Sequence, residues 1–268
     1  MAIQLDFSNQ TVLVVGGTSG INRRIAEMFA EQGARVAVAS RGPEKVADTV
    51  KKLQSLGAEA MGFSADVRDA DAIGAGIKDV YQNYGEFDVL VSGAAGNFPA
   101  LAENLTPNGF KSVVDIDLRG TFHVMHAAFP YLKKPGASLI NISAPQAFIP
   151  VMAQIHVAAA KAGVDMITRN LALEWGRHGI RINSVTPGPI ADTVGMARVA
   201  PTDEAMDHTA QSVPLGRLGQ CDDIGNACLF LASEMASYIS GVVLPVDGAW
   251  AQNGLGGMSD HLATLVES

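Results

Sequence analysis

Short apolar runs alternate with longer amphipathic stretches along the chain, and this rhythm constrains the fold more than any other feature of the sequence. The apolar runs have the length and composition of buried parallel strands, and the stretches between them have the length and periodicity of helices. The alternation therefore predicts an α/β fold with a doubly wound parallel sheet of about seven strands, flanked by helices. The strands are expected at Thr11–Val15, Arg35–Ala39, Ala60–Ser64, Val89–Ser92, Ser138–Ile142, Arg181–Val185 and Val242–Val246, and the helices at roughly Ile21–Gln32, Pro43–Leu56, Ala70–Tyr84, Gly109–Leu132, Met152–Arg177 and Asp222–Ala232.

The length and composition fit one globular domain. Of the 268 residues, 48% are hydrophobic and 17% are charged, and no linker or repeat divides them, so residues 1–268 are expected to form a single domain. The net charge of −8 and the lack of a basic stretch argue against a nucleic-acid partner. No stretch approaches the ~20 apolar residues of a membrane span, which argues against a membrane partner. Neither a secretion signal nor a peroxisomal Ser-Lys-Leu address is present, so we expect a cytoplasmic protein.

A glycine-rich turn follows the first predicted strand. It contains Gly16, Thr18, Ser19, Gly20 and Ile21, and it leads into the first predicted helix. Glycines allow the backbone to approach a pyrophosphate, which then lies on the amide groups of the helix N-terminus. Ligands of doubly wound sheets bind beyond the carboxyl ends of the strands, where this turn is expected to lie. The turn therefore predicts a dinucleotide site in a Rossmann fold.

A second motif surrounds Lys161. The segment 154–161 reads Gln-Ile-His-Val-Ala-Ala-Ala-Lys and opens a long predicted helix. With the glycine-rich turn, it resembles the short-chain dehydrogenase/reductases, whose motif is Tyr-x-x-x-Lys, and the resemblance covers nearly the whole chain. Three positions depart from that family. Val157 replaces the tyrosine, Ala144 stands thirteen residues earlier where the family has serine, and Asp117 replaces the asparagine of an Asn-x-x-Gly pattern.

The resemblance implies a nicotinamide cofactor, and Arg41 favours NADP(H). Relatives that prefer NAD carry an acidic residue at this position, whereas an arginine can pair with a 2′-phosphate. Two departures affect the same region. Asn22 replaces the last glycine of Gly-x-x-x-Gly-x-Gly, and Gly-Ala-Ala-Gly at 93–96 replaces the usual Asn-Asn-Ala-Gly, with Ser92 at the first asparagine. No metal site is predicted. The implied cofactor-binding residues are Gly16, Thr18, Ser19, Gly20, Ile21, Arg41, Asp66, Val67, Ala94, Lys161, Pro187, Gly188, Ile190 and Thr193.

The replacements themselves resemble one branch of the family, the 2,4-dienoyl-CoA reductases of the peroxisomal type. The strings Ala-Ala-Gly-Asn-Phe at 94–98 and Leu-Glu-Trp-Gly at 173–176 add to this resemblance, which covers roughly residues 7–250. In such a reaction, hydride from NADPH adds to a conjugated thioester, negative charge collects on the thioester oxygen, and a proton then reaches carbon. No alcohol forms, so the tyrosine that handles a hydroxyl proton in other members is not required.

The resemblance also implies roles for single residues. Asp117 and Lys161 are expected to organise a water that delivers the proton, giving a 3-enoyl-CoA. His156 is a candidate for polarising the thioester oxygen, and Ser143 is a second one. For Asp117 the alternative is a structural role, with its carboxylate bonded to backbone, and for His156 it is packing beside the cofactor. The residues expected to bind the acyl-CoA substrate are Arg68, Phe98 and Arg198, with solvated surface charge as the alternative for the two arginines.

Two other functions stay open at this point. A 3-oxoacyl-thioester reductase or other carbonyl reductase would need a substitute for the missing tyrosine, and His156 is the nearby candidate. A non-catalytic NADP(H)-binding scaffold would need neither tyrosine nor serine, although the retained Lys161 and Arg41 argue against it. The family resemblance implies a homotetramer built on the two longest helices. Residues 187–213 are expected to form a substrate lid, and residues 253–268 a flexible tail.

Overall fold

The predicted α/β fold is confirmed in the computed structural model, which describes residues 5–200 and 202–253. One seven-stranded sheet has the order β3-β2-β1-β4-β5-β6-β7, and each neighbouring pair of strands is parallel. The strands are β1 (Thr11–Val15), β2 (Arg35–Ser40), β3 (Ala60–Ser64), β4 (Val89–Ser92), β5 (Ser138–Ile142), β6 (Arg181–Pro187) and β7 (Val243–Val246).

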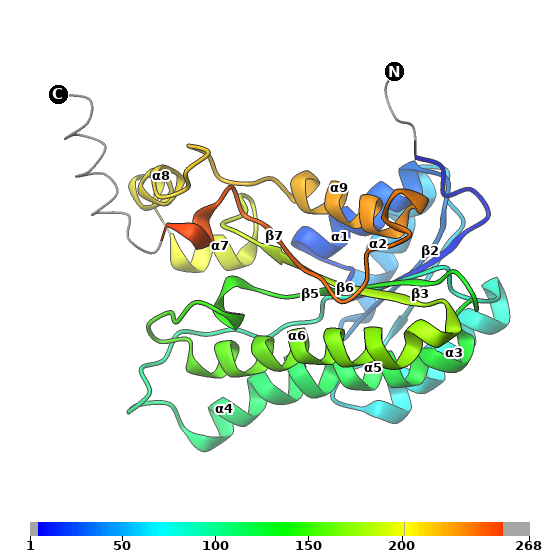
Figure 1. The fold of residues 1–268 in the computed structure, drawn as a ribbon, viewed down its shortest axis with the longest axis horizontal. Coiled ribbons are helices and arrows are strands. Elements are labelled where there is room, and N and C mark those ends of the chain that lie inside the picture. The colour runs from blue at the N-terminus through cyan, green and yellow to red at the C-terminus, as the bar shows by residue number, and fades with distance from the viewer. Residues whose placement is uncertain (1–4, 201, 254–268) are drawn as a thin grey trace.

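Helices cover both faces of the sheet (Figure 1). Helices α1, α2 and α9 pack on one face, whereas α3, α5 and α6 pack on the other, with α4 leading into α5. The helices are α1 (Gly20–Glu31), α2 (Pro43–Ser55), α3 (Ala70–Tyr84), α4 (Pro107–Val114), α5 (Gly120–Ala128), α6 (Ile155–Trp175), α7 (Val194–Val199), α8 (Asp203–Gln211) and α9 (Cys221–Ala232).

The central strand β1 shows how the core is divided. Its side chains alternate between the two faces, so Val12 and Val14 join the cluster under α1 and α9, whereas Leu13 and Val15 join the cluster under α3 and α5. Burial of each such side chain stabilises the fold by about 1.5–3 kcal/mol. Because both faces are covered in this way, the ends of the strands are left for ligands.

The direction of the chain across the sheet reverses at β1, which lies between β2 and β4. The turn after β1 and the loop after β4 therefore leave the sheet toward different helices and open a crevice between them. This is the position at which doubly wound sheets bind their ligands. The strand order thus places the glycine-rich turn at the edge of the crevice.

Two long helices differ from their predicted forms. The helix expected over 109–132 consists of α4, a π-helical turn at Asp115–Arg119, α5 and a 3₁₀ turn at Phe129–Tyr131. The helix expected from Met152 begins instead at Ile155, because Ala153 has a φ of 61° and this left-handed conformation cannot continue into a right-handed helix. The spacing of apolar residues in the sequence does not predict either of these local changes.

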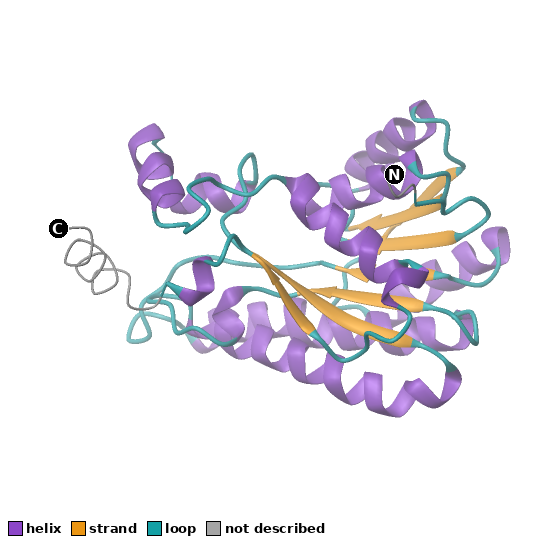
Figure 2. Ribbon diagram, turned by 45° about the horizontal axis from the view of Figure 1, so that its top comes forward, coloured by secondary structure: helices purple, strands orange, loops and turns teal. Residues whose placement is uncertain are grey.

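The segment 187–213, expected as a lid, carries the short helices α7 and α8 beyond the sheet (Figure 2). Each begins at a threonine cap: the side chain of Thr193 accepts a hydrogen bond from the amide of Met196, and that of Thr202 accepts one from Ala205. The predicted tail lies outside the described residues except for Asn253. In the part of the chain that the structure describes, no helix is both long and apolar enough to cross a membrane.

Candidate active site

A cleft of about 310 Å³ opens at the carboxyl ends of β1 to β4. It brings together half of the cofactor-binding residues that the sequence predicted, from four separate segments. It also has lining residues that the sequence did not single out, of which Lys45 adds a second cation beside Arg41. The predicted residues in its lining are Gly16, Thr18, Ser19, Arg41, Asp66, Val67 and Ala94, and the unpredicted ones include Ser40, Lys45, Ala95 and Ile116.

The glycine-rich turn is shaped by two glycines with a left-handed backbone, one of which also lies close to the loop after β4. Gly16 has a φ of 83°, and a Cβ at this position would lie 2.7 Å from the amide nitrogen of Ala94, so a side chain fits neither the conformation nor the space. Gly20 has a φ of 51° and begins α1, whose N-terminus faces the turn. The Thr18 hydroxyl donates a hydrogen bond of 2.9 Å to the hydroxyl of Ser40, which ties the turn to the end of β2. The turn thus has the form that a pyrophosphate requires.

Charges of both signs lie at the β2 and β3 end of the cleft. Arg41 and Lys45 line it beside Gly42, the N-cap of α2. The Asp66 carboxylate accepts hydrogen bonds of 3.0 and 2.6 Å from the guanidinium of Arg68, and this partner lowers the Asp66 pKa to about 2. Arg68, predicted as a substrate residue, is therefore paired with a predicted cofactor residue. Half of its side chain remains exposed.

A π-helical turn presents Asp117 to the interior. The amide of Gly120 donates to the carbonyl of Asp115, five residues earlier, which widens the helix by one residue. The glycine allows close packing here, since a Cβ on Gly120 would lie 2.7 Å from the Val67 side chain. Widened turns of this kind occur at functional sites because they re-aim a side chain. Here the turn holds the Asp117 side chain at 1% exposure.

Asp117 and Lys161 form a buried ion pair. The Lys161 Nζ lies 3.3 Å from Oδ2 of Asp117, with the two side chains 6% and 1% exposed. Oδ1 of Asp117 accepts a hydrogen bond of 2.7 Å from the amide of Gly96, and Lys161 donates one of 2.9 Å to the carbonyl of Ile142. Both predicted catalytic residues are thus fixed in one place by backbone groups at the ends of β4 and β5.

The position of the missing tyrosine is filled by apolar packing. Val157 is 4% exposed and packs with Val113 and Ala160 in a small hydrophobic cluster between α4 and α6. It offers no group that can exchange a proton. Ala144, at the position of the missing serine, adds none. Proton handling at this site therefore falls to other residues.

His156 lies beside Val157 at the start of α6 and is completely buried. Its ring meets the ring of Phe98 edge to face, with centroids 4.7 Å apart at 83°. Neither ring nitrogen of His156 nor Oε1 of the buried Gln154 has a hydrogen-bond partner among the described residues. Buried polar atoms usually pair with protein, water or ligand. His156 and Phe98, both predicted on the substrate side, are therefore adjacent in a place suited to a polar ligand group.

A buried carboxylic acid that the sequence did not single out lies near Ser143. Asp165 lies one helical turn after Lys161 and is 3% exposed. Burial raises the Asp165 pKa, whereas the hydroxyls of Ser143 and Ser184 and the charges of Arg169 and Lys161 lower it. The four-residue spacing from Lys161 was the available signal, because it places both side chains on one side of the helix.

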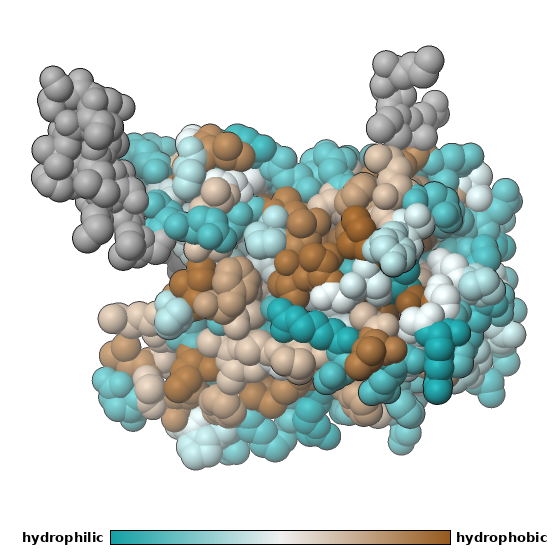
Figure 3. Space-filling view, viewed as in Figure 1, coloured by the Kyte–Doolittle hydropathy of each residue, from teal (hydrophilic) through white to brown (hydrophobic). Residues whose placement is uncertain are grey.

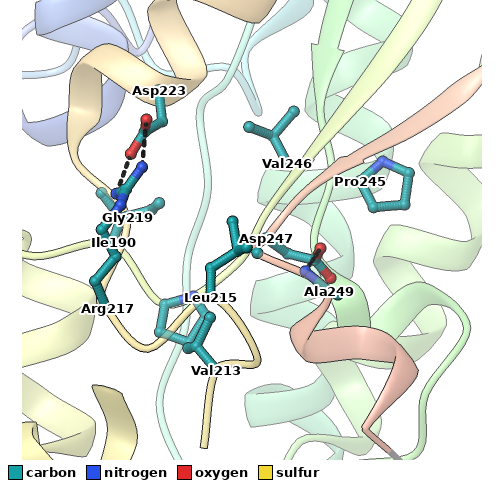
Figure 4. Close-up of a pocket in the computed structure, with 12 residues that line it drawn as sticks. Ile190, Val213, Leu215, Arg217, Gly219, Asp223, Pro245, Val246, Asp247 and Ala249 are labelled. Carbon is teal, nitrogen blue, oxygen red and sulfur yellow. Dashed lines mark hydrogen bonds and ion pairs between the residues drawn. The ribbon is translucent and has the colours of Figure 1, made fainter. Parts of the chain in front are cut away.

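The loop after β6 lines a second cavity of about 250 Å³ rather than the first cleft (Figure 4). Ile190 lines this cavity between the end of the lid segment and the end of β7, and Arg217 on its rim pairs with Asp223. Backbone hydrogen bonds of 2.9 and 2.8 Å join Pro189 and Ala191 to Gly219. The predicted residues Pro187 and Gly188 extend from the sheet into this braced loop, and Gly188 bonds to β7.

Apolar side chains surround the starts of α4 and α6, where the surface is brown and tan at the lower left of Figure 3. The predicted Phe98 belongs to this region. The third predicted substrate residue, Arg198, lies in α7, and its side chain is outside the described part of the chain. The exposed apolar residues of the region are Phe98, Leu101, Phe110, Phe148, Met152 and Ile155.

Comparisons with known proteins show the family to which the chain is similar. The family described as enoyl-(acyl carrier protein) reductase matches residues 15–250. A "Peroxisomal 2,4-dienoyl-CoA reductase [(3E)-enoyl-CoA-producing]" of Arabidopsis thaliana is 44% identical over 249 residues, covering 89% of this chain and 83% of the relative. A "Probable 2,4-dienoyl-CoA reductase [(2E)-enoyl-CoA-producing]" of Bacillus subtilis is 40% identical, covering 89% and 95%. The crystal structure of a short chain dehydrogenase from Bacillus anthracis is 37% identical with a TM-score of 0.81, covering 90% of this chain and 96% of that one.

Proposed function

Because the chain belongs to the short-chain dehydrogenase/reductase family, we propose that it reduces a conjugated 2,4-dienoyl-CoA thioester with NADPH. One dienoyl-CoA, one NADPH and one proton give one 3-enoyl-CoA and one NADP⁺. The relatives named 2,4-dienoyl-CoA reductase, at 40% and 44% identity, support this reaction. The expected fold and the class of oxidoreductase come from the family, whereas the substrate and the residue roles are proposals.

The observation that carries the proposal is the buried Asp117–Lys161 pair beside a packed Val157. A carbonyl reductase of this family needs a phenol to protonate the carbonyl oxygen as the alcohol forms, and Val157 has no proton to give. A dienoyl thioester needs a proton only at carbon, after charge has developed on its oxygen. Asp117 and Lys161, which backbone groups hold together, would bind and orient a water that delivers this proton.

Other residues of the site have separate proposed roles in binding the cofactor and the thioester. NADPH would supply the hydride when bound, and Lys161 would help to hold its nicotinamide ribose. His156 has a ring nitrogen available to donate to the thioester oxygen, where charge develops. Ser143 remains the alternative donor, although its hydroxyl lies beside Asp165. Phe98 packs against His156 and thus forms the apolar wall next to the reacting group.

We propose NADP(H) rather than NAD(H) as the cofactor. Arg41 and Lys45 both line the end of the cleft that follows β2. The N-terminus of α2 begins at the same place, at Gly42, and adds a partial positive charge. A 2′-phosphate would meet all three. The remaining glycine-turn residues, with Asp66, Val67 and Ala94, would hold the rest of the dinucleotide.

The coenzyme A and acyl parts of the substrate have separate candidate contacts. We propose that Arg68, half exposed beside the cleft, and Arg198 on α7 meet phosphates of coenzyme A. The apolar side chains around the starts of α4 and α6 would contact the acyl chain. Residues 187–213 would close over it, since the Thr193 methyl group lies 3.8 Å from the Cβ position of Gly20 and so brings the lid against the cofactor turn.

A homotetramer and a cytoplasmic location also remain proposals. Phe122 on α5 and Met166 and Leu173 on α6 are 51%, 51% and 82% exposed, which gives the two long helices an apolar outer surface. Such a surface is suited to a partner subunit. Light scattering of the purified protein tests the tetramer, and a fluorescent fusion tests the location against the peroxisome that several relatives' names specify.

The test is to mix the protein with NADPH and a 2,4-dienoyl-CoA, and in parallel with a 3-oxoacyl-CoA. Loss of diene absorbance together with NADPH, without turnover of the ketone, is the expected result. Turnover of the ketone alone would instead assign a carbonyl reductase with His156 as the acid. NADPH binding without turnover of either substrate would favour the non-catalytic scaffold.

The position of the remaining double bond needs its own measurement, because the two relatives are named for different products. NMR of the product in deuterated water locates both the double bond and the carbon that received the solvent proton. A 3-enoyl product is expected from proton delivery at the carbon next to the thioester. A 2-enoyl product would place the proton donor elsewhere in the site.

A further inference from the structure

Two residues that line the cofactor cleft are complementary in size, because the side chain of Asn22 fills the space beside Gly93. Asn22 is the third residue of α1, and Gly93 directly follows β4. Nδ2 of Asn22 donates a hydrogen bond of 2.7 Å to the carbonyl of Gly93. A Cβ on Gly93 would lie 2.4 Å from both terminal atoms of the Asn22 amide. The side chain of Asn22 therefore occupies the space into which any side chain at position 93 would extend.

Space, and not backbone conformation, is what requires glycine at position 93. Gly93 does not have a positive φ, unlike Gly16 and Gly20 in the neighbouring turn. An ordinary residue could adopt its conformation if the Asn22 amide were absent. The requirement at position 93 is thus created by position 22.

The family pattern has the two residue types the other way round. Glycine stands at the position of Asn22 in Gly-x-x-x-Gly-x-Gly, and asparagine stands at the position of Gly93 in Asn-Asn-Ala-Gly. We propose that Asn22 and Gly93 are one reciprocal exchange, and that Asn22 is a positioning residue for the dinucleotide. An amide from α1 takes over the place of an amide from the β4 loop, and it holds the same two segments together.

The exchanged pair connects the cofactor turn with the proton-delivery pair. On one side, the turn approaches the β4 loop closely at Gly16 and Ala94. On the other side, the same loop continues to Gly96, whose amide donates to Asp117. Oδ1 of Asn22 has no partner among the described residues, so its amide is held by the Gly93 carbonyl alone. A change at either position should therefore shift the loop that both ligand sites use.

This inference rests on the proposed function for its ligand, so the probe is NADPH itself, without acyl-CoA. Wild type, Asn22→Gly, Gly93→Asn and the double variant are titrated with NADPH by fluorescence, and their Tm is measured without ligand. Gly93→Asn should weaken NADPH binding by at least ~10-fold, and Asn22→Gly by ~5–10-fold, since each removes or displaces the partly buried hydrogen bond between α1 and the β4 loop. The double variant should return to within ~3-fold of wild type.

Substitution of a residue with a packing role alone should change the Tm without changing the Kd for NADPH. Gly225 on α9 is the matched control, because a Cβ there would lie 2.1 Å from Sδ of Met28 on α1, within the core under α1 and α9. Gly225→Ala should lower the Tm and leave the NADPH Kd unchanged. The exchange proposal requires that Gly93→Asn changes the Kd at temperatures where the variant is folded, and that Asn22→Gly rescues it.

The outcomes separate the two proposals. A double variant that binds NADPH no better than Gly93→Asn overturns the exchange, as does a Gly93→Asn variant that binds like wild type. If Gly93→Asn does not fold, a double variant that folds and binds NADPH supports the exchange, and one that also fails to fold overturns it. Wild-type protein that does not bind NADPH would overturn the positioning role and the proposed cofactor together. Binding without dienoyl-CoA turnover would overturn the proposed reaction alone.

Discussion

Replacement of Asp117 tests the proton-delivery site most directly. Asp117→Ala removes two interactions at once: the 3.3 Å ion pair with Lys161 and the acceptor for the 2.7 Å hydrogen bond from Gly96. Asp117→Asn removes the charge but keeps an oxygen for Gly96. The comparison of the two variants thus separates the electrostatic role of the carboxylate from its structural role.

The magnitudes follow from the geometry. Two unit charges at 3.3 Å attract each other by about 5 kcal/mol at an effective dielectric constant of about 20, before the desolvation of both ions is subtracted. Removal of one member of a buried pair destabilises a protein by about 3–5 kcal/mol, because the other charge stays buried without its partner. Asp117→Asn should be more stable than Asp117→Ala by about 1–3 kcal/mol, the effect of a buried amide left without an acceptor.

The assay combines urea unfolding, NADPH titration and dienoyl-CoA turnover. Both variants should lose activity by about 10²–10⁴-fold, the range for removal of a proton-transfer group. NADPH should still bind to Asp117→Asn, because the residues of the cleft are unchanged. An Asp117→Asn variant with near-wild-type turnover would refute proton delivery by this carboxylate. In that case the pair would have a structural role alone.

Three further predictions concern other residues of the site. Arg41→Asp should shift the preference from NADPH toward NADH by removing one of two cations at the end of the cleft, and an unchanged ratio of kcat/KM values would place the 2′-phosphate elsewhere. Val157→Tyr should not raise dienoyl-CoA turnover and should destabilise the fold by about 1–3 kcal/mol through overpacking against Val113 and Ala160, whereas a large gain in activity would contradict the assignment of the proton donor. Burial raises the Asp165 pKa above the usual 3.8, so the unfolded chain ionises first and stability falls as pH rises from about 4 toward the folded pKa. Asp165→Asn should remove this loss of stability, so the Tm of the variant minus the Tm of wild type should increase between pH 4 and pH 8. A Tm difference that does not change with pH would mean that Asp165 does not titrate as expected.

Much of the fold could be predicted because it depends on local periodicity. The central strands are short apolar runs buried on both faces, and longer amphipathic stretches separate the strands, so the order of the elements follows from the sequence without tertiary information. The dinucleotide turn could be predicted for the same reason, since its glycines, strand and helix are contiguous. The seven strands of the sheet lie where the apolar runs are, within a residue or two.

The parts of the site that could not be predicted depend on contacts between distant segments. The packing of Val157 between α4 and α6 and the burial of Asp165 each follow from how one element lies against another. The π-helical turn at Asp117 changes the helix by one residue, and a hydrophobic pattern does not resolve this. No repeating pattern of residues in the sequence indicates any of these features.

The chain by itself determined the class of fold, the cofactor turn and the absence of a phenol at Val157, because residue identity and local spacing are enough for each. Only the tertiary structure shows that apolar packing fills the position of the phenol and that the Asn22 amide occupies the space beside Gly93. Asn22 and Gly93 are 71 residues apart, and Asp117 and Lys161 come from different helices. They meet because the parallel sheet brings the carboxyl ends of its strands to one edge. At this edge, side chains that are distant in the sequence come into contact, so the size or charge of one constrains the other.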